Sequence, residues 1–277
     1  MLDKSVIILV VSREILEGSV VDRNAAFIAN RIDDLGYRVR TIQVVDRVES
    51  EMVAALRWAL EQRPKFVIMT GGIGPNWDDN TRACLAKAAN LPLKEDKRAL
   101  EQIKNAYRRM NAKGLIREVE LTEARAGMAR VPEGSICHEN TVGTAPAVQL
   151  RVGPTTVFLL PGVPGEMQRL FTQHVLPAMS AEGPVTVRGE RQLDYHSQDE
   201  SAISRVLRDL AKDHPQISLR TSVRGSEDVL TIRIRIVAEH TDPVALDEML
   251  ERADADLRAR LGIEMNERPT DAGRMGD

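Results

Sequence analysis

The chain has little cysteine and no long hydrophobic run. Its two cysteines, Cys84 and Cys137, lack CxxC spacing and lie far apart in the sequence. This pattern argues against a disulfide framework or a zinc site, and we expect both to be small buried residues. The longest apolar run, Val6–Val11, is too short to cross a bilayer, and Met1 is followed by acidic Asp3 rather than by basic residues. These absences predict a soluble, cytoplasmic protein with no membrane partner.

The chain also lacks a large excess of charge of one sign. The formal net charge is −3 over 277 residues, so no global basic field favours nucleic acid as a partner. The hydrophobic content of 43% can bury a sizeable core, and the length allows one large domain or two ordinary ones. The Ala-Glu-Gly-Pro stretch at 181–184 favours a boundary there, and hence two domains.

Apolar runs alternate with helical patterns through the first part of the chain. Strands are predicted at 6–11, 39–45 and 66–69, and apolar residues with helical spacing occupy 21–35 and 52–60. This order implies parallel strands joined by right-handed crossovers, and therefore a layered α/β domain. Ligands of such sheets bind beyond the carboxyl ends of the strands.

A glycine-rich loop follows the third predicted strand and precedes an alanine-rich helix. It contains Gly71, Gly72 and Gly74, whose backbone could turn sharply and present N–H groups to an anion at a helix N-terminus. The loop has no lysine and fits neither the GxxxxGK[ST] nor the GxGxxG spacing. We therefore expect a phosphate or pyrophosphate site that is neither a P-loop nor a Rossmann site. A side chain at Gly72 is expected to block the phosphate and leave the fold intact.

Other polar segments are expected at the same sheet edge. Residues 12–18 follow the first strand, and Asp46 ends the second. A hairpin of strands at 147–152 and 155–160 leads directly into the proline-glycine turn at 161–166. All these segments are predicted to meet in one crevice.

Four separated motifs, in order along residues 1–180, resemble the N-terminal domain of the CinA family. This domain is of the MoaB/Mog, molybdopterin-binding type. The motifs are Glu14, Gly18, Asp22 and Asn24; the loop Thr70-Gly71-Gly72-Ile73-Gly74-Pro75-Asn76-Trp77-Asp78-Asp79; Asn140 with Gly143-Thr144-Ala145-Pro146; and Leu160-Pro161-Gly162-Val163-Pro164-Gly165-Glu166-Met167.

The resemblance implies a fold and a set of candidate activities. The fold is a three-layer αβα domain followed by a smaller α+β, KH-like domain at 184–264 and a loose tail at 265–277. The implied activity is metal-dependent hydrolysis of ADP-ribose or a related nucleotide diphosphate. The alternatives are molybdopterin binding in molybdenum-cofactor synthesis and a non-catalytic nucleotide-binding regulator. CinA proteins continue into a deamidase domain, which we do not expect here because the chain ends at Asp277.

Pyrophosphate cleavage needs a phosphate clamp, a metal and a positioned water. We expect Asp46, Asp78 and Asp79 to bind a divalent metal such as Mg²⁺, with Asp46, Asp79 and Glu14 catalytic and either Glu14 or Glu166 orienting the water. Capping by Asp78 or Asp79, a turn opened by Asp46, and solvated helix-end charges at Glu14 and Glu166 stay open as alternatives. The expected ligand-binding residues are Thr70, Gly71, Gly72, Gly74, Pro75, Asn76, Asn24, Asn140, Gly143, Thr144, Pro161, Gly162, Pro164 and Glu166.

Three residues depart from the CinA pattern. Ser12 and Arg13 stand where the family usually has glycine and a small polar or acidic residue, and Asn76 replaces a threonine. Arg13 adds a cation that could favour a second phosphate or block an adenine pocket. The ligand is therefore expected to be a nucleotide or a pterin, and its exact identity stays open.

The second domain is predicted from its element order of strand, helix, two strands and helix. Arg233 and Arg235 alternate with isoleucines, which indicates a basic outer face, but residues 184–264 contain no GxxG clamp for RNA. The apolar stripe formed by Ile232, Ile234 and Ile236 must be buried, and we expect it to support a homodimer.

Overall fold

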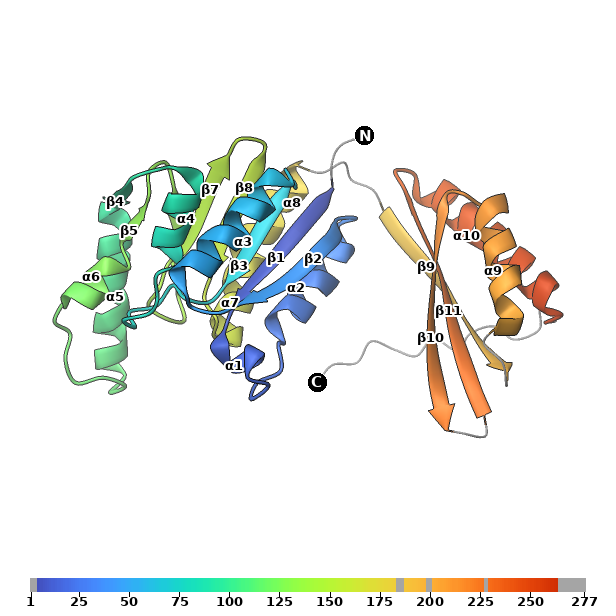
Figure 1. The fold of residues 1–277 in the computed structure, drawn as a ribbon, viewed down its shortest axis with the longest axis horizontal. Coiled ribbons are helices and arrows are strands. Elements are labelled where there is room, and N and C mark those ends of the chain that lie inside the picture. The colour runs from blue at the N-terminus through green and yellow to red at the C-terminus, as the bar shows by residue number, and fades with distance from the viewer. Residues whose placement is uncertain (1–3, 183–186, 198–200, 227–228, 264–277) are drawn as a thin grey trace. The chain divides into compact units, whose positions relative to one another are not determined.

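The computed structural model describes residues 4–182, 187–197, 201–226 and 229–263. The chain divides into two compact units, residues 1–183 and 184–277 (Figure 1). Each unit has a hydrophobic core of its own.

The first unit is built on a six-stranded sheet with the order β2-β1-β3-β8-β7-β6. The first four strands are parallel, and β7 runs antiparallel to both of its neighbours. The strands are β1 (Ser5–Val11), β2 (Arg38–Val45), β3 (Phe66–Thr70), β6 (Ile136–His138), β7 (Ala147–Val152) and β8 (Thr155–Leu160). The hairpin of β7 and β8 is as predicted, whereas β6 was not predicted.

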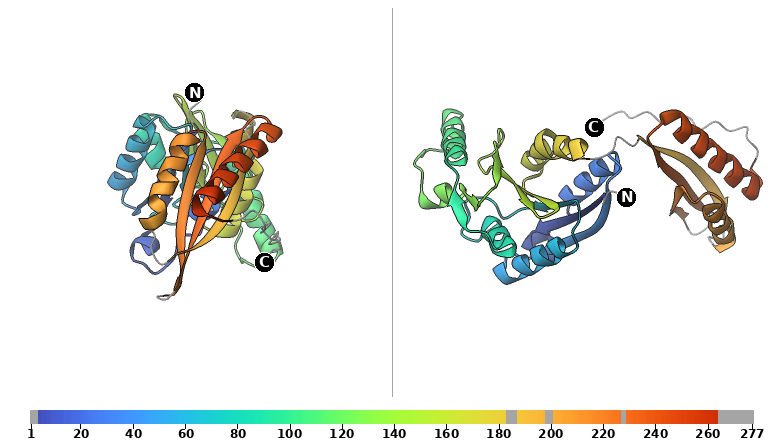
Figure 2. Two further views of the ribbon diagram at one scale, coloured as in Figure 1. Left: turned by 90° about the vertical axis from the view of Figure 1, so that its right-hand side faces the viewer. Right: turned by 90° about the horizontal axis from the view of Figure 1, so that it is seen from above.

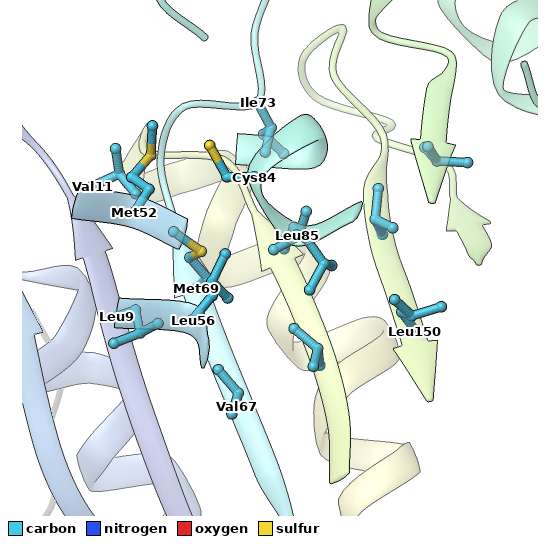
Figure 3. Close-up of a cluster of buried hydrophobic side chains, with 14 of the residues drawn as sticks. Leu9, Val11, Met52, Leu56, Val67, Met69, Ile73, Cys84, Leu85 and Leu150 are labelled. Carbon is cyan, nitrogen blue, oxygen red and sulfur yellow. The ribbon is translucent and has the colours of Figure 1, made fainter. Parts of the chain in front are cut away.

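Helices cover both faces of this sheet, as Figure 2 shows from above. Alternate side chains of β1 pack in the two cores on opposite faces of the sheet. Ile7 and Leu9 belong to one core, and Val6 and Ile8 to the other. Figure 3 shows the first core, in which α3 (Glu49–Glu61) and α4 (Thr81–Ala89) pack on the sheet. One side carries α3 (Glu49–Glu61), α4 (Thr81–Ala89) and α5 (Lys97–Ala112), with β4 (Leu93–Glu95), β5 (Arg130–Pro132) and α6 (Glu123–Gly127) nearby. The predicted three-layer αβα fold is confirmed.

The opposite core is covered by α2 (Asn24–Asp33) and by a long helical segment with a widened turn. That segment consists of α7 (Pro164–Leu170), the π-helix η1 (Phe171–Val175) and α8 (Leu176–Glu182). Met167 in α7 and Met179 in α8 are both completely buried in this core. A short helix, α1 (Arg13–Leu16), follows β1.

Cys84 is buried as expected, whereas Cys137 is only partly buried. Cys84 and Cys137 are both free thiols, and burial raises the pKa of Cys84 to about 11 and that of Cys137 to about 12. Neither thiol is therefore ionised at neutral pH. None of the helices within the described ranges is both long and apolar enough to span a membrane.

The second unit has an antiparallel sheet of order β10-β11-β9 with two helices on one face. Its elements are β9 (Val187–Ser197), α9 (Ser201–Asp213), β10 (Ile217–Ser226), β11 (Val229–His240) and α10 (Pro243–Leu261). This arrangement confirms the predicted smaller α+β unit. The predicted tail at 265–277 lies outside the described residues.

The isoleucine stripe of β11 is buried within the second unit. Ile232, Ile234 and Ile236 are at most 1% exposed and pack under α9 and α10. The inference that this stripe needs a second copy of the chain is therefore wrong, and the homodimer stays a prediction without that support. Arg233 faces the other way and forms an ion pair with Asp194, with Nε 2.8 Å from Oδ1.

The separate cores predict that the first unit folds alone. Residues 1–183 should give a single cooperative thermal transition by circular dichroism, because both cores of the sheet lie within this range. Loss of the cooperative transition would show that the first unit depends on the second.

Candidate functional site

A cavity of about 750 Å³ lies beyond the carboxyl ends of β1, β3 and β8 in the first unit. In the sheet, β1 lies between β2 and β3, so the strand that follows β1 in the chain and the next strand lie on opposite sides of it. The cavity therefore lies at a topological switch point. Its wall is formed by residues 10–15, 19–24, 70–76, 144–145 and 161–166, apart from Arg13 and Gly165, together with Arg47 and Asp79. The structure therefore brings most of the predicted motifs to one place.

Two successive glycines give the loop after β3 its shape. Gly71 has φ of +93° and Gly72 has φ of +68°, a region that other residues rarely adopt. A Cβ at Gly71 would overlap the carbonyl oxygen of Val11, and one at Gly72 would overlap the hydroxyl of Thr81. The expectation that a side chain at Gly72 would leave the fold intact is therefore wrong, since it would first meet the protein itself.

Three carbonyls of this loop are turned toward the start of α4. Gly71 O accepts a hydrogen bond from Thr81 Oγ1 (3.0 Å), and Gly72 O accepts one from Thr81 N (3.1 Å). Ile73 O accepts one from the buried guanidinium of Arg82. In a trans peptide the N–H points opposite to the C=O, and the described residues include no cis peptide. The N–H groups that follow these carbonyls therefore point away from α4.

These N–H groups belong to Gly72, Ile73 and Gly74, which all line the cavity. Within the described residues none of the three has a hydrogen-bond partner. Thr70 Oγ1 and Asn24 Oδ1, two buried polar atoms of wall residues, also have no partner. The Ile73 side chain is fixed in the core beside Cys84 and Leu85 (Figure 3), so the donors are held on a rigid segment. Clustered free N–H groups of this kind bind anions.

Arg47 lies at the centre of an ion-pair network beside the loop. Its Nη1 is 3.3 Å from Asp78 Oδ1 and 3.4 Å from Asp79 Oδ1, and its Nη2 is 3.6 Å from Glu14 Oε1. Asp79 Oδ2 accepts a hydrogen bond from Asn76 N (3.0 Å). Asp79 therefore connects Arg47 to the glycine loop.

The aspartates predicted to bind a metal are paired with arginine side chains. Asp46 accepts a hydrogen bond from Arg13 Nε (3.1 Å), which lowers the pKa of its carboxyl group, and Asp78 and Asp79 contact Arg47. In the described part of the chain, no three His, Cys, Asp or Glu side chains gather as a metal site. Asp46 and Asp78 do not line the cavity, whereas Asp79 does. As they stand, the three do not fit a metal ion together, and metal binding stays a prediction.

The geometry does not support the alternative that Asp78 or Asp79 caps α4. The N-cap residue of α4 is Asn80, and the helix has no side-chain cap hydrogen bond.

Glu14 lines the cavity and is not simply a solvated charge. Hydrogen bonds from its own backbone N–H and from the hydroxyl of Ser12 (2.8 Å) lower the pKa of its carboxyl group.

Asn140 holds Glu166 in position at the opposite wall. Its Nδ2 donates to Glu166 Oε2 (2.6 Å) and to Ala145 O (3.1 Å), and its Oδ1 accepts from Gly143 N (2.7 Å). A Cβ at Gly143 would overlap the Glu166 carboxylate. Asn140 and Gly143 do not line the cavity, whereas Thr144 and Glu166 do. Asn140 and Gly143 therefore do not face the cavity themselves but hold the Glu166 carboxylate in place.

The remaining predicted residues join α2 to the proline-glycine turn. Asn24 Nδ2 donates to Gly162 O (2.8 Å), and Asp22 Oδ1 accepts from Asn24 N (2.9 Å) at the start of α2. Pro161, Gly162 and Pro164 line the cavity, as do Thr70, Pro75 and Asn76. Arg13 does not line it.

Sequence reasoning missed two arginines. Burial lowers the pKa of Arg82 to about 10, which leaves it a cation at neutral pH. Its position one residue inside the predicted helix gave no sign that it folds back onto the loop. Arg47 directly follows Asp46 at the end of β2, and that position could have indicated that Arg47 belongs to the site.

Comparisons with known proteins show the family. A family model described as a probable molybdopterin binding domain matches residues 7–181. The chain belongs to this family.

Similar proteins extend the comparison. A protein of Pyrobaculum arsenaticum is 34% identical over 264 residues, which cover 94% of this chain and 97% of that protein. The crystal structure of CinA from Thermoplasma acidophilum, a protein of unknown function, is 37% identical with a TM-score of 0.56, covering 63% of this chain and 97% of that one. MoaB from Thermus thermophilus is 18% identical with a TM-score of 0.40, over 64% of this chain and 97% of its own. The first unit is thus a CinA-like domain of the molybdopterin-binding-domain family, as its motifs predicted.

The loop geometry predicts different costs for two glycine substitutions. Gly18 has φ of +74° but open space around it, so Gly18→Ala should cost only the conformational strain of about 1–2 kcal/mol. Gly72→Ala adds the overlap with Thr81 and should cost about 1–3 kcal/mol more, measured by urea denaturation. In a Thr81→Ala background this extra cost should shrink; equal costs in both backgrounds would contradict the overlap.

Proposed function

We propose that the first unit binds the phosphate or diphosphate group of a nucleotide or pterin through the N–H groups of Gly72, Ile73 and Gly74. The observation that carries this proposal is the direction of those groups: all three point away from α4, line the cavity and have no partner among the described residues. A phosphate oxygen accepts several hydrogen bonds, which matches three donors on one turn.

The rest of the cavity suits the remainder of such a ligand. Its volume of about 750 Å³ lies within the range of cofactor and small-molecule sites. Val10, Ile15, Val20 and Val21 give the wall an apolar part. A flat ring system and a sugar or side chain can therefore occupy the cavity beside the phosphate.

The charge of the wall indicates how a phosphate would enter. Four carboxylates line the cavity against two guanidinium groups: Glu14, Asp22, Asp79 and Glu166 against Arg23 and Arg47. A bare diphosphate would meet net negative charge at short range. We therefore expect the ligand to bind as its complex with a divalent cation, so that the cation arrives with the diphosphate.

The reaction that we propose is hydrolysis of ADP-ribose or a related nucleotide diphosphate. Glu14 and Glu166 both line the cavity and can accept a hydrogen bond from a water near the scissile phosphate. The second candidate is molybdopterin binding, which the family description supports directly. Binding of a nucleotide without turnover would identify a regulator instead.

A ligand panel separates these candidates. ADP-ribose, AMP and molybdopterin should be tested by thermal shift with Mg²⁺ and with EDTA, since a ligand that binds only the folded state raises Tm. We expect ADP-ribose and Mg²⁺ together to raise Tm and to release AMP, measured by chromatography. A shift with molybdopterin alone would favour the second candidate, and no shift with any ligand would refute the proposed site.

The charge balance predicts unequal effects for two arginines. Arg47→Met should weaken AMP binding about tenfold or more, measured by calorimetry in Mg²⁺, because it removes a cavity-lining cation together with its ion pairs to Asp78 and Asp79. Arg13→Met is the matched control, since Arg13 pairs with Asp46 outside the cavity wall. Equal losses in both variants would contradict the role given to Arg47.

A further inference from the structure

Trp77 lies at the tip of the glycine loop, and the fold does not bury it. Its side chain is 96% exposed, whereas the loop around it is fixed. A hydrogen bond from Asp79 N to Asn76 O (3.0 Å) closes a tight turn with Trp77 and Asp78 at its centre. Exposed single apolar residues are common, but an indole is the largest apolar side chain and a frequent centre of binding sites.

Trp77 and Asp78 lie just outside the cavity wall, next to residues that belong to it. Asn76 lines it directly, and Asp78 contacts Arg47, which also lines it. In the described ranges Trp77 takes part in no ring stack or cation–π contact. Neither the turn nor a neighbouring side chain accounts for an indole here.

The spacing along the loop matches the length of a phosphorylated ring compound. Trp77 is three residues beyond Gly74, the last of the free donors, so the two are at most about 10 Å apart. This is the scale of a single nucleotide from its phosphate to its base. Val20 and Val21 provide further exposed apolar surface on the cavity wall, at 51% and 79% exposure.

We infer that Trp77 stacks on the flat ring of the ligand whose phosphate is bound by Gly72, Ile73 and Gly74. This assignment rests on the proposed function and makes Trp77 the residue that selects ligands with an aromatic ring over plain sugar phosphates. Base and pterin rings share the chemistry that the indole recognises, namely a planar π surface.

The test uses the fluorescence of Trp77 itself. Trp58, on α3, is the only other tryptophan in the sequence, so Trp58→Phe leaves Trp77 as the sole reporter. In Mg²⁺, AMP and neopterin phosphate carry a ring, whereas ribose 5-phosphate does not. Ring stacking should quench Trp77 with AMP or neopterin phosphate, whichever ring the site accepts, and ribose 5-phosphate should bind by calorimetry without quenching.

Trp77→Ala then measures the contribution of the stack. It should weaken binding of the quenching ligand about five- to 150-fold and leave the affinity for ribose 5-phosphate and Tm unchanged, since the side chain is exposed. Trp77→Phe, which keeps an aromatic face, should retain most of the affinity.

Two failures have different meanings. If AMP or neopterin phosphate binds Trp77→Ala as well as the parent, the stacking assignment is overturned and the phosphate site stands. If none of the three compounds binds the parent, the proposed function and this inference are both overturned. A change of oligomeric state in Trp77→Ala by light scattering, with unchanged ligand affinity, would show that a second copy covers the indole instead.

Discussion

The two hydrogen bonds from Thr81 to the carbonyls of Gly71 and Gly72 determine how the loop presents its backbone. Because peptide planes are rigid, fixing two carbonyls also fixes the direction of the next two N–H groups. The buried Arg82 does the same for the third. This arrangement requires positive φ angles at positions 71 and 72, which glycine adopts without steric strain. The proposed anion site therefore depends on carbonyls that are held on the far side of the loop.

Arginines balance acidic groups throughout this region. Arg47 pairs with three carboxylates from two separate segments, and Arg13 pairs with Asp46. Partly exposed pairs like these contribute little stability on their own. Their main effect is on geometry, because Asp79 accepts from Asn76 and contacts Arg47 at the same time. The acidic side chains are thus ordered before any ligand arrives.

The alternation of strands and helices along the chain, the hairpin and the edge of the sheet that carries the candidate site all followed from hydrophobic periodicity and glycine placement. These signals are local, and parallel strands must present their carboxyl ends together. The contact between Arg47 and Asp78 joins residues 31 positions apart, and no pattern in a single sequence specifies such a pair. The cover of Ile234 was missed for a similar reason: alternation shows that a face is apolar but not which element packs on it.

The π-helix between α7 and α8 shows how the long helical segment keeps contact with the sheet. Met167 and Met179 are twelve residues apart, and at about 100° per residue an uninterrupted α-helix would place them about 120° apart around its axis. A π turn holds one extra residue, which reduces the offset to about 20°. Both methionines are completely buried in the same core. The segment has thus absorbed the equivalent of a one-residue insertion in a single turn, and the helix after that turn stays in phase with the helix before it.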